Sequence, residues 1–195
     1  MKQTYRDAWR TNDVTETLWD CGGDSIAILA PCGGDIEAGS DTVAGEAHKQ
    51  LVRVELAPTT WMVHGFGEDA MTNYYRSPTS LKPDTYPMFA TIAERRFQYA
   101  ISFRVHDAST VKIGGRVHTG VQRALATELR ERLSTTSVDT VDPATTDSGT
   151  KRANVVNWLT VDGEGGVEIK LPPIVAWRDW RDVAQAVAAV YFDIL

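Results

Sequence analysis

The stretch Ser25-Ile-Ala-Ile-Leu-Ala-Pro-Cys-Gly-Gly-Asp-Ile-Glu-Ala-Gly-Ser40 carries the signal that decides the fold. Its first part, from Ser25 to Pro31, is an almost continuous apolar run that ends in Pro-Cys-Gly-Gly. A run of this kind followed by glycines is typical of a buried strand that leads into a tight loop. Ser40 can cap a helix that we expect over residues 41–51, with Asp41 in its first turn.

The rest of the chain alternates between strand-like and helix-like segments. β-branched and aromatic residues predict strands at 59–64, 99–106, 110–113 and 166–171. Apolar spacing predicts helices at 87–95, 121–133 and 178–195, with one helical turn at 154–158 and a long loop at 65–86. This alternation predicts an α/β fold with a mixed, largely parallel sheet and helices on both faces.

The length of 195 residues and the 43% apolar share suit a single domain with its own core. We therefore expect one domain over 1–195, in which 1–24 is a lead-in with a short helix and an edge strand, and 134–152 is an exposed loop. No apolar run reaches the roughly 20 residues of a membrane span. The first residues lack an apolar stretch after their charges, so we expect a soluble protein without a signal peptide.

The net charge of −6 argues against nucleic acid as a partner. The cations are 14 Arg and only 6 Lys, and low lysine with many acids is compatible with a high-salt organism. A mildly acidic mesophilic protein fits the same composition. The two cysteines, Cys21 and Cys32, do not make a disulfide scaffold, and whether they bond to each other is left open.

Four chemically versatile residues lie near the expected carboxyl ends of strands: Cys32, Glu37, His106 and Lys170. Ligands of open α/β sheets sit at those ends, so we expect a site there. Among the other histidines, His64 lines this cleft or is structural, His48 lies on a solvated helix face, and His118 begins a helix. The chain has no Gly-x-Ser-x-Gly elbow and no phosphate loop.

Three short motifs, spread over residues 20–172, resemble the phage-type poly-γ-glutamate hydrolases, a zinc-dependent, carboxypeptidase-like family. The first is Ala30-Pro-Cys-Gly-Gly-Asp-Ile-Glu-Ala-Gly-Ser40, where the family has Ala-Pro-His-Gly-Gly-x-Ile-Glu-x-Gly-Thr and binds zinc through His and Glu. The second is Tyr99-Ala-Ile-Ser-Phe-Arg-Val-His106, similar to a strand that supplies the family's second histidine ligand. The third is Asn154-Val-Val-Asn followed by Gly166-Val-Glu-Ile-Lys170, where the family ends in its general-base Glu.

The resemblance implies that three of four key positions have changed. Cys32 and Arg104 stand where the family has histidine ligands, Lys170 stands at the general-base position with Glu168 adjacent, and Glu37 is kept. Arginine has no lone pair to offer a metal. At about 4 Å and an effective dielectric near 20, its repulsion of a divalent cation is about 8 kcal/mol. We therefore expect no zinc, no catalytic residues, and an ion pair of Glu37 with Arg104, Lys170 or both.

A shifted metal site is the alternative. His106 lies on the same strand face as Arg104, so Cys32, Glu37 and His106 could supply the three ligands of a catalytic zinc. Such a site would cut poly-γ-glutamate-type polymers, with Glu168 or Asp107 as the substitute base and the cations as carboxylate clamps.

The function expected from these residues is therefore that of an inactive poly-γ-glutamate hydrolase-like protein reused as a structural or binding component. The phage context of the family suggests a tailed virus particle, of a haloarchaeal host if the composition reflects high salt. Partners would be further copies of the chain, other virion proteins or an acidic polymer, with Trp177 and Trp180 as candidate anchors. The alternative is an active zinc-dependent amidase or peptidase.

Overall fold

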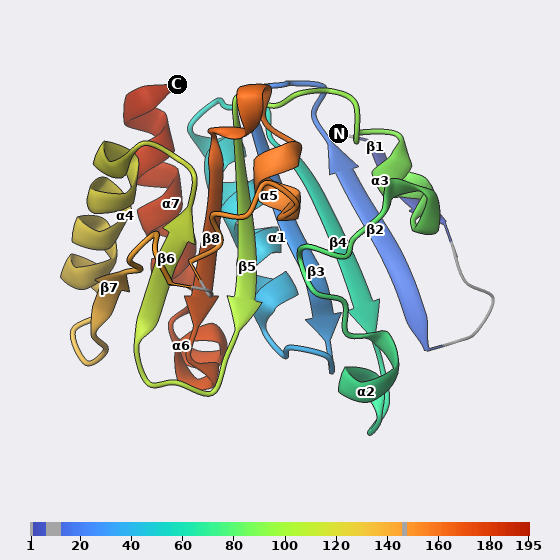
Figure 1. Cartoon of the computed structure of the whole chain (residues 1–195), viewed down its shortest axis with the longest axis horizontal. Coiled ribbons are helices and arrows are strands. Elements are labelled where there is room, and N and C mark those ends of the chain that lie inside the picture. Colours follow the sequence, from blue (N-terminus) through green and yellow to red (C-terminus); the bar gives the residue numbers. More distant parts are fainter. Residues whose placement is uncertain (1, 7–12, 146–147) are drawn as a thin grey trace.

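The computed structural model describes residues 2–6, 13–145 and 148–195. These residues form one eight-stranded sheet with the strand order β1-β2-β4-β3-β5-β8-β6-β7 (Figure 1). The strands are β1 (Lys2–Arg6), β2 (Val14–Asp20), β3 (Ile26–Gly34), β4 (Thr59–Gly65), β5 (Tyr99–Val105), β6 (Val111–Gly115), β7 (Val138–Thr140) and β8 (Gly166–Leu171).

The centre of the sheet is parallel and its flanks are mixed. Strands β4, β3, β5 and β8 pair in parallel, as do β6 and β7. The pairs β1–β2, β2–β4 and β6–β8 are antiparallel. The expected α/β architecture with a mixed, largely parallel sheet is confirmed. The four central parallel strands end at the same edge of the sheet, which is where their loops can meet.

Helices cover both faces of the sheet, as expected. One face carries α1 (Ser40–Arg53), α4 (Thr119–Arg132) and α7 (Trp180–Ile194), packed on apolar residues such as Ile101 and Phe103. The other face carries α3 (Pro87–Ala90) and α5 (Val155–Trp158), packed on Ala100 and Leu29. Because side chains alternate along a strand, Ser102 and Arg104 of β5 lie on this second face.

Several expected boundaries differ from the structure. Helix α1 begins at Ser40 itself, with Gly39 as the N-cap. The segment 65–86 contains the short helix α2 (Ala70–Tyr74) and a 3-10 turn at Pro83–Thr85, and the helix expected at 87–95 ends at Ala90. The last helix is preceded by a separate one, α6 (Pro173–Arg178). The loop at 134–152 contains β7, and its residues 146–147 lie outside the described part.

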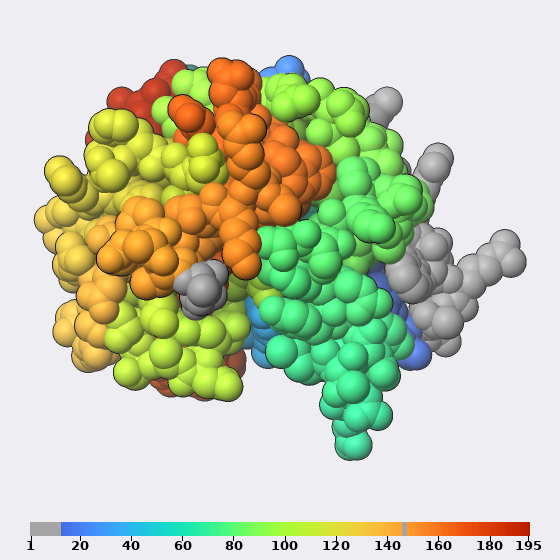
Figure 2. Space-filling view, viewed as in Figure 1, coloured from blue at the N-terminus to red at the C-terminus, as the bar shows by residue number. Residues whose placement is uncertain are grey.

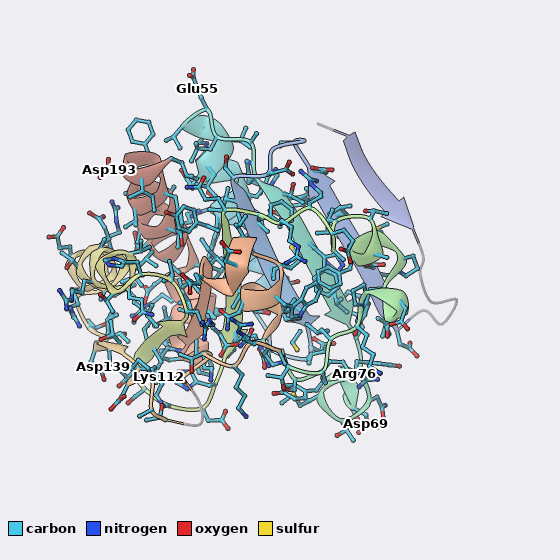
Figure 3. The ribbon with its side chains drawn as sticks, turned by 45° about the horizontal axis from the view of Figure 1, so that its top comes forward. Glu55, Asp69, Arg76, Lys112, Asp139 and Asp193 are labelled. Carbon is cyan, nitrogen blue, oxygen red and sulfur yellow. The ribbon has the colours of Figure 1, made fainter. Side chains whose placement is uncertain are left out.

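The lead-in supplies the edge strand β1 and the strand β2, which lies between β1 and β4. Its residues 1 and 7–12, and any expected helix there, lie outside the described part. Residues 66–97 and 148–165 lie side by side over the face of α3 and α5 (Figure 2). Asp69, Arg76 and Lys112 lie at one end of the molecule and Glu55 at the other (Figure 3). Within the described residues, no helix has both the length and the apolar character to cross a membrane.

Candidate functional site

Glu37 is held by a tight loop between β3 and α1. Its backbone N–H donates to Cys32 O at 2.8 Å, and Ser40 Oγ donates to the same carbonyl at 3.3 Å. Gly39 has φ 95°, and a Cβ there would lie 2.9 Å from the carbonyl oxygen of Ala176 in α6. The glycine therefore lets the loop pack closely on α6, which fixes where the Glu37 carboxylate points.

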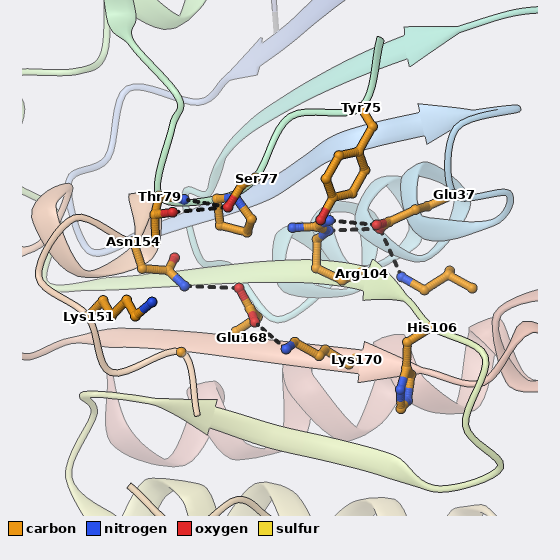
Figure 4. Close-up of a pocket in the computed structure, with 13 residues that line it drawn as sticks. Glu37, Tyr75, Ser77, Thr79, Arg104, His106, Lys151, Asn154, Glu168 and Lys170 are labelled. Carbon is orange, nitrogen blue, oxygen red and sulfur yellow. Dashed lines mark hydrogen bonds and ion pairs between the residues drawn. The ribbon is translucent and has the colours of Figure 1, made fainter. Parts of the chain in front are cut away.

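A bidentate ion pair joins Glu37 to Arg104 at the end of β5. Arg104 Nε donates to Glu37 Oε2 at 2.8 Å and Nη2 donates to Oε1 at 2.5 Å (Figure 4). The backbone N–H of Val105 adds a third donor at 3.0 Å. Both side chains are only 6% exposed, so the pair is buried. The ion pair expected between Glu37 and Arg104 is therefore present.

Tyr75 covers the guanidinium. The Arg104 Cζ lies 5.3 Å from the centre of the Tyr75 ring, a cation–π distance. Burial by itself lowers the pKa of Arg104, but the hydrogen bonds to Glu37 and Tyr75 and the nearby negative groups outweigh it, and the pKa is raised. Arg104 is thus a permanent cation at this position.

A second buried carboxylate, Glu168 on β8, lies beside the first. Asn154 Nδ2 donates to Glu168 Oε2 at 3.0 Å, and Lys170 Nζ lies 3.2 Å from Glu168 Oε1. Asn154 is also the N-cap of α5, where its side chain accepts from Val156 N. Of the two partners expected for Glu37, Arg104 is the one that binds it, and Lys170 pairs with Glu168 two residues earlier on the same strand face.

These groups line a cavity of about 300 Å³ at the carboxyl ends of β5 and β8. Figure 4 shows Ser77 and Thr79 next to each other and Lys151 beside Asn154. The described lining residues include two carboxylates and three cations, which leaves one positive charge in excess when His106 is neutral. The full lining is Glu37, Tyr75, Ser77, Pro78, Thr79, Arg104, Val105, His106, Gly149, Lys151, Asn154, Glu168 and Lys170.

Cys32 does not present a metal ligand to this cavity. It is completely buried against Ile36 and Ala70, and its thiol donates to the carbonyl oxygen of Arg76 at 3.6 Å. Burial is the main reason why the pKa of Cys32 is raised to about 11, partly offset by Arg104. The thiol is therefore protonated near neutral pH, whereas zinc binds the thiolate.

The alternative zinc ligands are not brought together. His106 Nε2 contacts the carbonyl oxygen of Thr110 at 3.0 Å, and Glu37 is occupied by Arg104. Among the described residues, no group of three or more His, Cys, Asp or Glu side chains is arranged to hold a metal ion. The expected set of Cys32, Glu37 and His106 is therefore not formed, and the side chains at this end of the sheet do not fit zinc. Asp107, the other suggested base, is exposed outside the cavity.

The other histidines lie away from this cavity. His48 was expected on a solvated face but is completely buried: its Nδ1 is 2.9 Å from Thr60 Oγ1 and its ring packs on Trp19. His64 lies on the opposite face of the sheet, with Nδ1 2.8 Å from Asp41 Oδ2. His118 caps α4 by accepting from Gly120 N, which confirms that it begins a helix.

The sequence did not single out Tyr75, Lys151 and Asn154 as cavity residues. The long segment 65–86 was a signal for the first, because long loops in compact domains are often functional. Asn154 opens the third motif, but its contact with Glu168 depends on how α5 packs over β8. Cys21 and Cys32 are both free thiols.

Comparisons with known proteins identify the fold. No family model matches the chain, and no curated protein matches its sequence. A solved bacteriophage poly-γ-glutamate hydrolase matches with a TM-score of 0.76 and 13% identity over 93% of this chain and 89% of its own. The zinc-free form of YNDL matches with a TM-score of 0.72 and 13% identity over 95% and 98%.

A metallo-carboxypeptidase from Burkholderia cenocepacia matches with a TM-score of 0.59 and 11% identity, over 98% of this chain and 64% of its own. At such identities the similarity establishes the fold and leaves the chemistry to the residues. The chain has the mixed-sheet fold of the carboxypeptidase-like zinc peptidases.

Proposed function

We propose that this chain is a non-catalytic protein built on a zinc-hydrolase fold, and that its cavity binds an acidic ligand instead of cleaving it. The observation that carries the proposal is the buried, bidentate ion pair between Arg104 and Glu37. A guanidinium satisfies the carboxylate that a metal would otherwise need. It also brings a fixed positive charge into the place where a divalent cation would have to bind.

Among the described residues, the general base that would activate a water molecule in such a reaction is lacking in the same way. A general base must be free to accept a proton within hydrogen-bond reach of the water. Glu168 accepts hydrogen bonds from Asn154 and Lys170, so both of its oxygens are engaged. The alternative of an active amidase would need Cys32 to turn back toward the cavity and Arg104 to leave.

An acidic ligand fits the charge of the cavity. Lys151 reaches the cavity wall, and its ammonium has no ion-pair partner in the part of the chain that the structure describes. Ser77 and Thr79, which carry hydroxyl groups, also line the cavity. Lysine and hydroxyl donors of this kind hold carboxylates, so a glutamyl polymer such as the one named for the bacteriophage hydrolase is the first ligand to test.

The test combines turnover and binding. The purified chain is incubated with a γ-linked glutamate oligomer, with and without added zinc, and new amino groups are measured. We expect no release above the blank under either condition. In parallel, calorimetry should give saturable binding that weakens with salt and in Lys151→Ala. Turnover that a chelator abolishes would overturn the proposal, and an absence of binding would refute its ligand.

A place in a virus particle is the setting we propose for this binding role, because a bacteriophage protein shares the fold. Self-association would use the apolar side chains that α6 exposes, where Trp177 is 79% exposed and Ile174 is 49% exposed. Large apolar side chains that one copy of the chain exposes to this extent favour an interface with a second copy. Light scattering after size exclusion tests this: we expect an oligomer that Trp177→Ala dissociates, and a monomer at high concentration would contradict it.

A further inference from the structure

The opposite face of the sheet has a cavity of its own, of about 420 Å³, between α1 and the strands β2 and β4. Its floor is formed by Thr15 and Thr17 of β2 and by their cross-strand partners His64 and Met62 of β4. Its walls come from α1, from Trp19, from Phe66 after β4 and from Trp180 at the start of α7. The Glu37–Arg104 site takes no part in it.

His64 offers this cavity a hydrogen-bond acceptor. Its Nδ1 lies 2.8 Å from Asp41 Oδ2, and Asp41 is held by the backbone N–H of Gly34 at 3.2 Å. Since an ionised carboxylate only accepts, Nδ1 of His64 carries a proton, and in the neutral form of the ring Nε2 presents a lone pair. Within the described residues, no hydrogen bond of Nε2 to another side chain or to the backbone is formed.

Thr17 offers a hydroxyl group. Its side chain is only 5% exposed, and the small exposed part belongs to the cavity floor. Its hydroxyl makes no hydrogen bond to any other described residue. Because this hydroxyl is reachable from the cavity, it can exchange a hydrogen bond with a ligand there.

The other walls are aromatic and apolar. Phe66 is 46% exposed and lies parallel to the His64 ring at a centroid distance of 6.4 Å. Trp19 is fixed edge-on against His48 at 5.2 Å, and its ring lies against Gly45 of α1. Met62 completes the apolar surface, and Trp180 adds a ring on which the Arg181 guanidinium stacks, 4.3 Å from the ring centre. Flat, rigid walls of this kind suit the apolar face of a ring.

Each charged side chain in the described lining has a partner. Asp41 accepts a hydrogen bond from His64, and Glu46 lies 3.8 Å from Lys49 and 3.7 Å from Arg53. No unpartnered charge among these lining residues selects an ionic ligand, which favours an uncharged one.

We propose that this second cavity binds one uncharged saccharide ring. A sugar hydroxyl would donate to Nε2 of His64, another would exchange a hydrogen bond with Thr17, and the apolar face of the ring would lie on Trp180 or Phe66. Apolar walls with a few convergent polar groups are the usual composition of a small-molecule site. This inference does not depend on what the Glu37–Arg104 cavity binds.

The test uses the full chain and four named probes: glucose, galactose, mannose and N-acetylglucosamine, each titrated to 50 mM or about that concentration, the weak range expected of a single ring. Binding is followed by tryptophan fluorescence and by saturation-transfer NMR of the sugar. We expect a saturable change with at least one sugar. Thr17→Val keeps the shape but removes the hydroxyl, so it should weaken binding roughly fivefold.

Two further variants locate the ring. Trp180→Ala should weaken binding by roughly tenfold or more, since it removes an aromatic wall. Phe192→Ala is the matched control, because Phe192 is exposed on α7, the helix that carries Trp180, and does not line the cavity. Binding that Phe192→Ala abolishes while Thr17→Val and Trp180→Ala do not would overturn the proposal, and so would the absence of saturable binding with all four sugars.

Discussion

Two glutamates are buried on the same face of the sheet, and they are satisfied in different ways. Glu16 of β2 is 1% exposed and accepts only neutral donors: Trp61 Nε1 at 2.6 Å, Met88 N at 3.0 Å and Phe89 N at 2.7 Å. Glu37 is 7% exposed and accepts from the Arg104 guanidinium and from Val105 N.

We interpret the difference as that between a structural carboxylate and the position that we propose as a former metal ligand. The backbone N–H groups of Met88 and Phe89 donate to Glu16 and so hold the start of α3 against the sheet. The described residues around Glu16 show no feature of a ligand site. Glu37 instead meets a full positive charge, at the cavity end of the sheet where the loop after β3 places its carboxylate. The proposed loss of metal chemistry requires that a carboxylate placed to bind a metal ion is paired with an arginine instead.

The largest expected effect comes from removing the cation. Arg104→Met leaves Glu37 buried with a single backbone donor, so we expect a loss of about 3–5 kcal/mol in the free energy of unfolding. Urea denaturation measures it. The matched control is Arg116→Met, which breaks a half-exposed pair with Glu164 at 3.9 Å and should cost below about 1 kcal/mol.

The double variant Arg104→Met, Glu37→Leu should recover most of that loss, because no charge is then left buried. If Arg104→Met costs no more than Arg116→Met, the ion pair has no special role and the contrast between the two glutamates disappears.

His48 is a titratable group that is buried in its neutral form, so it makes the stability of the fold depend on pH. Burial, aided by Lys49, lowers its pKa from 6.5 to about 4. The unfolded chain therefore binds a proton that the folded chain refuses, and stability should fall as the pH drops from about 6.5 through about 4, by at most about 3 kcal/mol. Denaturation midpoints across this range measure the slope. His48→Asn should flatten it, and an unchanged slope would assign the effect to other groups.

Glu16→Gln tests the neutral arrangement. The glutamine amide either points its N–H₂ group at the backbone N–H donors of Met88 and Phe89, or turns that group away and loses one acceptor. We therefore expect a loss of about 1–3 kcal/mol in the free energy of unfolding. Hydrogen exchange should also accelerate at Met88 and Phe89. Glu94→Gln, on an exposed residue nearby, is the control and should change neither quantity. Equal protection of the two amides in Glu16→Gln would argue against the pinning role.

The smallest effect is expected at the cover of the ion pair. Tyr75→Phe keeps the ring over Arg104 and removes only the hydroxyl, so stability should fall by about 1 kcal/mol or less. Thermal unfolding of Tyr75→Phe beside Tyr74→Phe measures the difference. A loss as large as that of Arg104→Met would mean that Tyr75, rather than Glu37, keeps the guanidinium in place.

The sequence predicted the sheet from local signals, and the resemblance to the hydrolase family singled out Arg104 and Lys170 as candidate partners of Glu37. Apolar runs that end in glycines mark strands, and residues after neighbouring parallel strands meet at one edge. The sequence could not predict which carboxylate pairs with Lys170. Both Glu168 and Glu37 are candidates, and the choice depends on how α5 packs over β8.

The error at His48 has a readable cause. Its neighbours Glu46 and Lys49 suggested a solvated face, but Ala44, Ala47 and Leu51 place His48 on the buried side of α1. The position of Tyr75 and Lys151 depends on how two long segments meet over the sheet, and no local pattern encodes that contact.

The central claim is that a guanidinium has replaced a metal ion, and zinc content tests it most directly. Purified wild-type chain and the variant Cys32→His, Arg104→His, Lys170→Glu are dialysed against zinc and analysed by elemental mass spectrometry. The account predicts almost no zinc in the wild type and about one ion per chain in the triple variant. Stoichiometric zinc in the wild-type protein would contradict it.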